Sequence, residues 1–260
     1  MRKIGIVYEA HPALRGEDWA KKVTELGFGA TFTDTYRTDA EQAKLAELFA
    51  KYGIAYETLH APFSHINDIW LDTDGGVAME RELLDTIDRC VAAGAPIAVM
   101  HMSSGLNPPP ITDLGRARWE RIVNYARQKN VKIAFENQRW LANLCYALET
   151  FTDQGFCWDC GHESCFTPGR QYMPLFGNRL ICTHIHDNSG VYNSDDHWIP
   201  FSGNVDYERV ARQIRESGFE GTLMLELSAK PKFYGDWTTD AYFEKAADAI
   251  KRLRTMVDGE

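Results

Sequence analysis

The feature of this chain that most constrains its fold is a regular alternation of two kinds of segment. Short runs rich in β-branched and aromatic residues are followed by longer stretches, many of which have the hydrophobic period of an amphipathic helix. This alternation predicts repeated βα units that build a parallel sheet. We expect strands at residues 3–8, 30–33, 54–60, 96–101, 131–136, 156–159, 180–185 and 222–227. We expect helices at residues 17–26, 39–52, 77–93, 113–129, 205–217 and 240–256.

About eight such units in 260 residues match the size of a (β/α)8 barrel. We therefore predict an α/β fold of the TIM barrel type. Residues 1–260 are expected to form a single domain, because no linker-like or low-complexity stretch divides the sequence. A doubly wound open sheet is the alternative, since local pattern cannot show whether a sheet closes on itself. The doubly wound fold is the less favoured of the two, because no glycine-rich phosphate loop follows any predicted strand.

Composition narrows the classes of function and partner. The formal net charge of -9 argues against a general nucleic-acid binder, whose surface would normally be basic. No apolar stretch approaches the roughly 20 residues that span a bilayer. The apolar run near the start is too short for a secretory signal, so we expect a cytoplasmic protein with no membrane partner. The six cysteines are expected to be reduced thiols, with Cys157 and Cys160 used for packing.

A carboxylate or a histidine stands near the end of one predicted strand after another. The last four predicted strands carry three carboxylates and one imidazole at their ends, those of Glu136, Asp159, His184 and Glu226. In a barrel whose strands all point one way, these ends meet on one face. Any one of the four alone could pair with a lysine, an arginine or a backbone amide. Together they are explained most simply by one divalent cation, because three unpaired buried carboxylates would repel one another.

The order of several motifs carries a resemblance to a known family. The segments LHAPF, FEN, WDCGHE, HIHDN, DDHWIPFSGNVDY and LELS, which run from Leu59 to Ser228, resemble those of the xylose isomerase-like TIM barrel superfamily. That superfamily includes sugar epimerases related to D-tagatose 3-epimerase, hydroxypyruvate isomerase and endonuclease IV. The resemblance covers nearly the whole chain. It is specific for the superfamily and weak for the substrate.

The resemblance implies a metal site and a ligand set. It implies that one divalent ion, Mn²⁺, Co²⁺, Mg²⁺ or Zn²⁺, is bound by Glu136, Asp159, His184 and Glu226. In the HIHDN segment, the family pattern has a histidine three residues before the acidic residue, here Asp187, which selects His184 as the ligand. His186 is therefore expected outside the ligand set.

The resemblance also implies an activity. An enzyme of this kind would isomerise or epimerise a small sugar or sugar-like ketose through a metal-stabilised cis-enediolate, with Glu136 and Glu226 moving the protons. A small carbohydrate is thus the expected partner. Members of the superfamily are often dimers or tetramers, so a homo-oligomer is compatible with the resemblance.

Two alternatives remain open. The first is an endonuclease IV-like enzyme that cleaves DNA at abasic sites with up to three Zn²⁺ ions. All nine residue types that resemble its ligands are present: His60, His101, Glu136, Asp159, His162, His184, Asp195, His197 and Glu226. Four histidines and one aspartate lie outside the four residues predicted to bind the single ion, and they could instead bind a second metal or the substrate. They are His60, His101, His162, Asp195 and His197. The acidic net charge is unfavourable for binding the phosphate backbone of DNA. The second alternative is an inosose dehydratase-like lyase.

Overall fold

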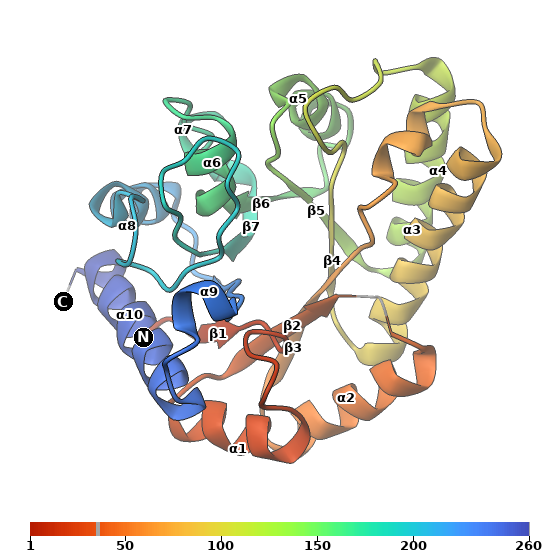
Figure 1. Ribbon diagram of the computed structural model, residues 1–260. Coiled ribbons are helices and arrows are strands. Elements are labelled where there is room, and N and C mark those ends of the chain that lie inside the picture. Colours follow the sequence, from red (N-terminus) through yellow and green to blue (C-terminus); the bar gives the residue numbers. More distant parts are fainter. Residues whose placement is uncertain (35–36, 260) are drawn as a thin grey trace. The chain divides into compact units, whose positions relative to one another are not determined.

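The computed structural model describes residues 1–34 and 37–259 of the chain (Figure 1). The chain divides into two compact units. Unit 1 comprises Met1–Phe32, Glu47–Tyr56 and Trp158–Glu260, and unit 2 comprises Thr33–Ala46 and Glu57–Cys157.

The described residues contain the eight strands that the sequence predicts. They are β1 (Ile4–Ile6), β2 (Ala30–Asp34), β3 (Ala55–His60), β4 (Ile97–Met100), β5 (Lys132–Glu136), β6 (Gly155–Asp159), β7 (Leu180–His184) and β8 (Leu223–Leu225). Their hydrogen-bonded order is β7-β6-β5-β4-β3-β2-β1-β8.

In unit 1, β1 pairs in parallel with β2 and β8, and Ile185 after β7 forms a parallel bridge with Leu225. In unit 2, β4 pairs in parallel with β3 and β5, and β5 with β6. Strands that are sequential along the chain are neighbours, and the two end strands of the order also meet. This connectivity is that of the predicted (β/α)8 barrel and excludes the doubly wound alternative.

The helices of unit 1 flank its strands. They are α1 (Gly16–Glu25), α6 (Cys160–Phe166), α7 (Met173–Phe176), the 3-10 turn η2 (Gly177–Arg179), α8 (Tyr207–Ser217), α9 (Pro231–Tyr234) and α10 (Thr239–Asp258). Helices α8 and α10 pack side by side (Figure 1). Each begins at a side-chain cap, because Asp206 accepts from the amide of Arg209 and Thr238 from that of Ala241. Both helices bury one face in the apolar core of the unit, and Ile214 lies on the buried face of α8.

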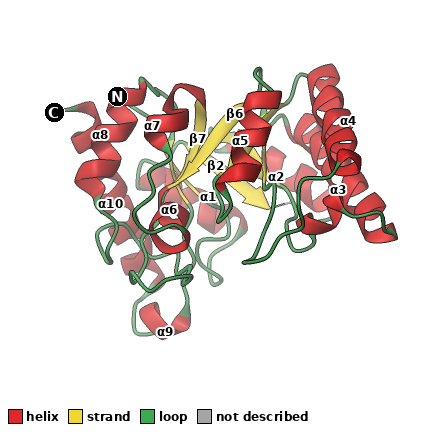
Figure 2. Ribbon diagram, turned by 90° about the horizontal axis from the view of Figure 1, so that it is seen from above, coloured by secondary structure: helices red, strands yellow, loops and turns green. Residues whose placement is uncertain are grey.

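Unit 2 contains the 3-10 turn η1 (Ile66–Trp70) and helices α3 (Asp74–Ala93), α4 (Asp113–Lys129) and α5 (Leu141–Thr150), while α2 (Asp39–Lys51) begins in unit 2 and ends in unit 1. Both views show α3 and α4 side by side (Figures 1 and 2). Buried Arg118 of α4 donates to the carbonyls of Ile69, at 2.9 Å, and Leu71, at 2.7 Å. A guanidinium thereby satisfies carbonyls at the end of η1 that have no helical partner. The loop after β3 is fixed against α4 as a result.

Strands β1 and β8 are each three residues shorter than predicted, although their hydrogen bonding continues. Residues 7 and 8 lie beyond β1, yet the amide of Val7 donates to the carbonyl of Leu225 at 2.9 Å. Glu226 lies one residue beyond β8, and its amide donates to the carbonyl of Ile185 at 3.1 Å. The predicted strand-end position of Glu226 is therefore retained.

The predicted state of the cysteines is confirmed. None of the six, all of which lie in the described part of the chain, forms a disulfide, and Cys157 and Cys160 are buried. Burial holds the pKa of the Cys160 thiol well above its usual value, as expected for a packing role. No helix among the described residues has the length and apolar character needed to cross a membrane.

Candidate functional site

Unit 2 gathers two histidines around one buried glutamate. His60 ends β3, His101 directly follows β4, and Glu136 ends β5, so parallel pairing brings the three strand ends together. The Nε2 atoms of His60 and His101 lie 3.2 and 2.6 Å from Oε2 of Glu136. All three side chains are buried. Phe63 lies over the His101 ring, with the ring centroids 4.6 Å apart.

The hydrogen bonds of His60 show which of its ring nitrogens faces Glu136. Its Nδ1 atom lies 2.8 Å from the carbonyl oxygen of Ala61. Because a carbonyl can only accept, Nδ1 carries a proton, and Nε2 is the ring nitrogen that faces Glu136. A lone pair and a carboxylate attract one another only when a proton or a metal cation lies between them. Two imidazoles and a carboxylate are also ligands that Zn²⁺ accepts, so this group fits a divalent ion.

Unit 1 gathers a second group around Asp195. Asp159 ends β6 and caps α6, accepting from the amide of His162 at 2.6 Å. This cap fixes the first turn of α6 and so the position of the His162 side chain. Oδ2 of Asp195 lies 3.3 Å from Nε2 of His162 and 3.1 Å from Nε2 of His197. Nδ1 of His197 lies 2.9 Å from the carbonyl oxygen of Glu226, so it donates there and its Nε2 faces Asp195.

Within this group, the charges of Asp195 and His197 shift each other's pKa. Burial alone would lower the pKa of His197, but the charge and the hydrogen bond of the Asp195 carboxylate, together with the charges of Glu226 and Asp159, raise it to about 9. Burial alone would raise the pKa of Asp195, but His197 and His162 hold it well below its usual range. An imidazolium facing a carboxylate is the arrangement that a metal ion would replace, with release of the proton.

The strand ends of unit 1 also bring together His184 and Glu226. Nδ1 of His184 lies 3.0 Å from Oε2 of Glu226. The His184 side chain is buried, and Phe32 stacks on its ring with centroids 4.6 Å apart. Three of the four residues predicted to share one ion, Asp159, His184 and Glu226, therefore belong to unit 1, and Glu136 belongs to unit 2. The common ion stays a prediction.

The long loop after β7 is held by one buried aspartate. The carboxylate of Asp187 accepts from the amides of Asn188 at 2.8 Å, Gly203 at 2.9 Å and Val205 at 3.0 Å. An antiparallel bridge, with both N–O distances 2.8 Å, joins the backbones of Asp187 and Trp198. These bonds position the segment that carries Asp195 and His197.

Sequence reasoning missed the contacts of His186. This residue is completely buried, and its Nε2 lies 3.1 Å from the carboxylate of Asp159 and 3.8 Å from Oδ1 of Asp195. Its ring stacks on that of His197, with centroids 4.1 Å apart. A signal was present in the sequence, because residues two apart in an extended segment point to the same side. If His184 faces the site, His186 does so too.

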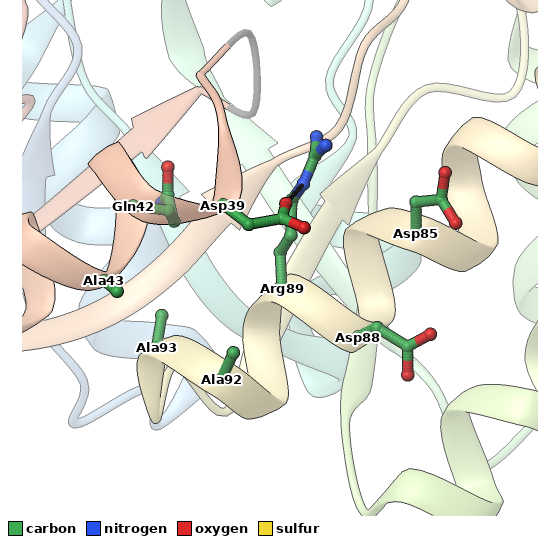
Figure 3. A pocket seen from close by; sticks show the side chains of 8 residues that line it. All are labelled: Asp39, Gln42, Ala43, Asp85, Asp88, Arg89, Ala92 and Ala93. Carbon is green, nitrogen blue, oxygen red and sulfur yellow. Dashed lines mark hydrogen bonds and ion pairs between the residues drawn. The ribbon is translucent and has the colours of Figure 1, made fainter.

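A cavity of about 350 Å³ lies in unit 2 against α2 and α3 (Figure 3). Asp85, Asp88 and Arg89 of α3 line it together with residues of α2. Arg89 turns toward Asp39, and its Nε donates to that carboxylate at 2.8 Å. The cavity is thus lined from two helices rather than from strand ends, and none of the described residues that line it is a histidine.

Comparison with known proteins assigns the chain to a family. Residues 20–255 match the family described as xylose isomerase-like TIM barrel. The chain belongs to this family. The resemblance and the fold class predicted from the sequence are thereby confirmed.

Individual relatives extend the comparison. An uncharacterised protein of Sinorhizobium fredii, y4fM, is 29% identical over 191 residues, which are 67% of this chain and 60% of that protein. The chain thus spans about 60% of the length of this relative. A D-tagatose 3-epimerase-like protein has a TM-score of 0.78 at 20% identity, covering 99% of this chain and 98% of its own.

Two further solved structures have bound molecules or ions in their descriptions. The D-allulose 3-epimerase of Methylomonas sp., in complex with D-allulose, has a TM-score of 0.72 at 16% identity, covering 97% of this chain and 98% of its own. The TTHB071 protein of Thermus thermophilus, soaked with ZnCl2, has a TM-score of 0.73 at 20% identity, covering 99% of both chains. At sequence identities of 16% and 20%, these two similarities show a shared fold and nothing more specific.

Proposed function

We propose that this protein is a divalent-metal-dependent isomerase or epimerase of a small sugar or sugar-like ketose. The contact between His184 and Glu226 at the ends of β7 and β8 carries the proposal. Both residues are among the metal ligands that the resemblance implies, and their side chains meet at 3.0 Å within one unit. The similar epimerase structures, one of them bound to D-allulose, support a sugar as the substrate.

The donor set suits this chemistry. When bound, a divalent cation would polarise a substrate carbonyl and acidify the C–H beside it. Glu136 and Glu226 are assigned the proton transfers. The Glu226 side chain is 19% exposed, so it keeps access to a small molecule. Return of the proton to the other face of the same carbon gives an epimer, and return to the neighbouring carbon gives an isomer.

Solvent exchange tests the proposal. The protein, loaded with Mn²⁺ or Co²⁺ and incubated in D2O with a panel of free ketoses, is expected to place deuterium on the carbon beside the carbonyl. Glu136→Gln and Glu226→Gln are each expected to abolish this exchange, whereas the same change at the exposed Glu208 of α8 leaves it intact. Undiminished exchange in both site variants would refute the assigned roles. A product that differs in mass from the substrate would identify a lyase instead.

A second candidate function is metal-dependent hydrolysis of phosphodiesters. The two histidine–carboxylate groups favour it, because a one-metal isomerase needs only Glu136 among their residues and leaves their histidines and Asp195 without a role as ligands. One is centred on Glu136 and the other on Asp195. Each offers the nitrogen and oxygen donors that Zn²⁺ prefers. The zinc-soaked TTHB071 protein, of similar fold, is consistent with this choice of metal.

Metal stoichiometry and a nuclease assay separate the two candidates. A nuclease of this kind is expected to hold about three zinc ions per chain and to cut a duplex at a single abasic position. The isomerase is expected to exchange deuterium and to leave that duplex intact. An intact duplex after incubation with the zinc-saturated protein would eliminate the hydrolase.

A further inference from the structure

We propose that His186 is a metal ligand that completes a closed, four-ligand zinc site within unit 1. The other three ligands are His162, Asp195 and His197, and these four residues are called the His186 site below. The site shares no residue with the four predicted for the catalytic ion, so it is independent of the isomerase proposal. It goes beyond the predicted residues of the Asp195 group by adding a fourth ligand and by closing the coordination shell.

The ligand atoms are already close together. One donor atom from each of the four side chains lies within 4.8 Å of every other. Zinc with four ligands at about 2.0 to 2.2 Å in a tetrahedron holds its donor atoms roughly 3.3 Å apart. Oδ2 of Asp195 stands at 3.3 and 3.1 Å from Nε2 of His162 and His197, and Oδ1 stands at 3.8 Å from Nε2 of His186. Small side-chain movements therefore suffice to bind an ion.

The surrounding structure fixes how the rings point. The bond from Nδ1 of His197 to the carbonyl of Glu226 leaves its Nε2 directed at Asp195. This is the outer hydrogen bond that metal-binding histidines usually make. The His162 ring stacks on Phe166, with centroids 4.7 Å apart. Two of the three rings are thus held in orientation before any ion binds.

Space for the third ring is provided by a glycine. A Cβ atom at position 161 would lie 2.1 Å from Cε1 of His186, inside the imidazole. Only glycine at this position, one residue before His162, allows the His186 ring to occupy its place. The sequence therefore preserves room for a fully buried imidazole beside two other imidazoles and two carboxylates.

An unsatisfied oxygen points to a missing partner. Among the described residues, Oδ1 of Asp195 is buried and has no hydrogen-bond partner. Nε2 of His186 also lies 3.1 Å from Asp159, so two carboxylates face this one ring. A divalent cation between the rings and Asp195 would satisfy that oxygen and neutralise the acidic charge.

Closed coordination sets the role of the ion. Three imidazoles and one carboxylate fill the four positions of tetrahedral zinc and leave none for water. The ion would therefore bind α6, the segment after β7 and the following loop to one another. This role differs from that of a zinc ion that activates hydroxide, which needs an open position.

Cobalt substitution tests the site without relying on activity. Metal-free protein is titrated with Co²⁺, and the visible absorption reports the coordination number. The wild type and His184→Asn, which lacks a predicted ligand of the catalytic ion, are both expected to give the intense bands of four-coordinate cobalt. His186→Asn is expected to lose them and to bind Zn²⁺ at least about tenfold more weakly in competition with a chromogenic chelator. His65→Asn, the same change at an exposed histidine, serves as the control.

The outcomes are distinct. A four-coordinate spectrum and an unchanged zinc affinity in His186→Asn would overturn the proposal. If that variant does not fold, His184→Asn still decides, because a five- or six-coordinate spectrum there refutes a closed site. Absence of deuterium exchange in the wild type removes the isomerase and leaves the His186 site untouched.

Discussion

Replacing Asp187 by asparagine is expected to loosen the loop that carries Asp195 and His197. The carboxylate is completely buried and accepts three backbone hydrogen bonds, two on Oδ1 and one on Oδ2. An amide keeps the oxygen that accepts two of them. Its NH2 group then faces the amide of Gly203, at the position where Oδ2 now accepts at 2.9 Å.

The magnitude follows from these bonds. A hydrogen bond to a charged group contributes roughly 1.5 to 3 kcal/mol, and one to a neutral group about 1 kcal/mol. Losing one bond and weakening two gives an expected loss of about 3 kcal/mol in the free energy of unfolding. The same change at Asp206, which caps α8 and is exposed, should cost less than about 0.5 kcal/mol, because asparagine caps helices as well as aspartate.

Urea denaturation followed by circular dichroism measures both variants. In addition, Asp187→Asn is expected to weaken zinc binding at the His186 site, because two of its ligands lie on the affected loop. If Asp187→Asn is as stable as Asp206→Asn, the three hydrogen bonds do not position the loop and the reasoning fails.

Two further predictions concern the same region. Gly161→Ala places a methyl group 2.1 Å from Cε1 of His186 and should cost about 1 to 3 kcal/mol through overpacking; unchanged stability in urea would show that the ring moves aside freely. In metal-free protein, burial lowers the pKa of His197, but Asp195, with smaller contributions from Glu226 and Asp159, raises it from 6.5 to about 9. The contact therefore contributes stability that is fully present below about pH 6.5 and lost as the pH rises through about 9. With a chelator present, His197→Asn should cost about 3 kcal/mol near pH 6, at about 1.4 kcal/mol per pKa unit, and far less above pH 10; a cost independent of pH contradicts this.

Much of the fold could be predicted because its signals are local. Apolar runs mark all eight strands, and the helix predicted over residues 77–93 ends, as the structure shows, at the C-cap Gly94, with a φ of 69°. Helix α5 escaped prediction because it has no polar face to reveal its period. Four of its buried residues, Leu144 and 146–148, come from adjacent turns and from several sides of the helix.

The site was predictable in its residue types and less so in its contacts. A carboxylate or histidine at a strand end can be recognised in the sequence, which is why Glu136, His184 and Glu226 were predicted as site residues. The grouping of His162 with His197 depends on the path of the loop after β7. That path is set by the bonds of Asp187 to amides as far away as Val205, which no local pattern encodes.

Zinc-edge anomalous diffraction from crystals equilibrated with ZnCl2 tests the central claim, that imidazoles and carboxylates at the strand ends and in the segments that follow them bind divalent metal. We predict one anomalous peak about 2.0 to 2.2 Å from all four donors of the His186 site and another at the same distance from His184 and Glu226. A map from zinc-saturated protein with no peak beside either group would contradict the account.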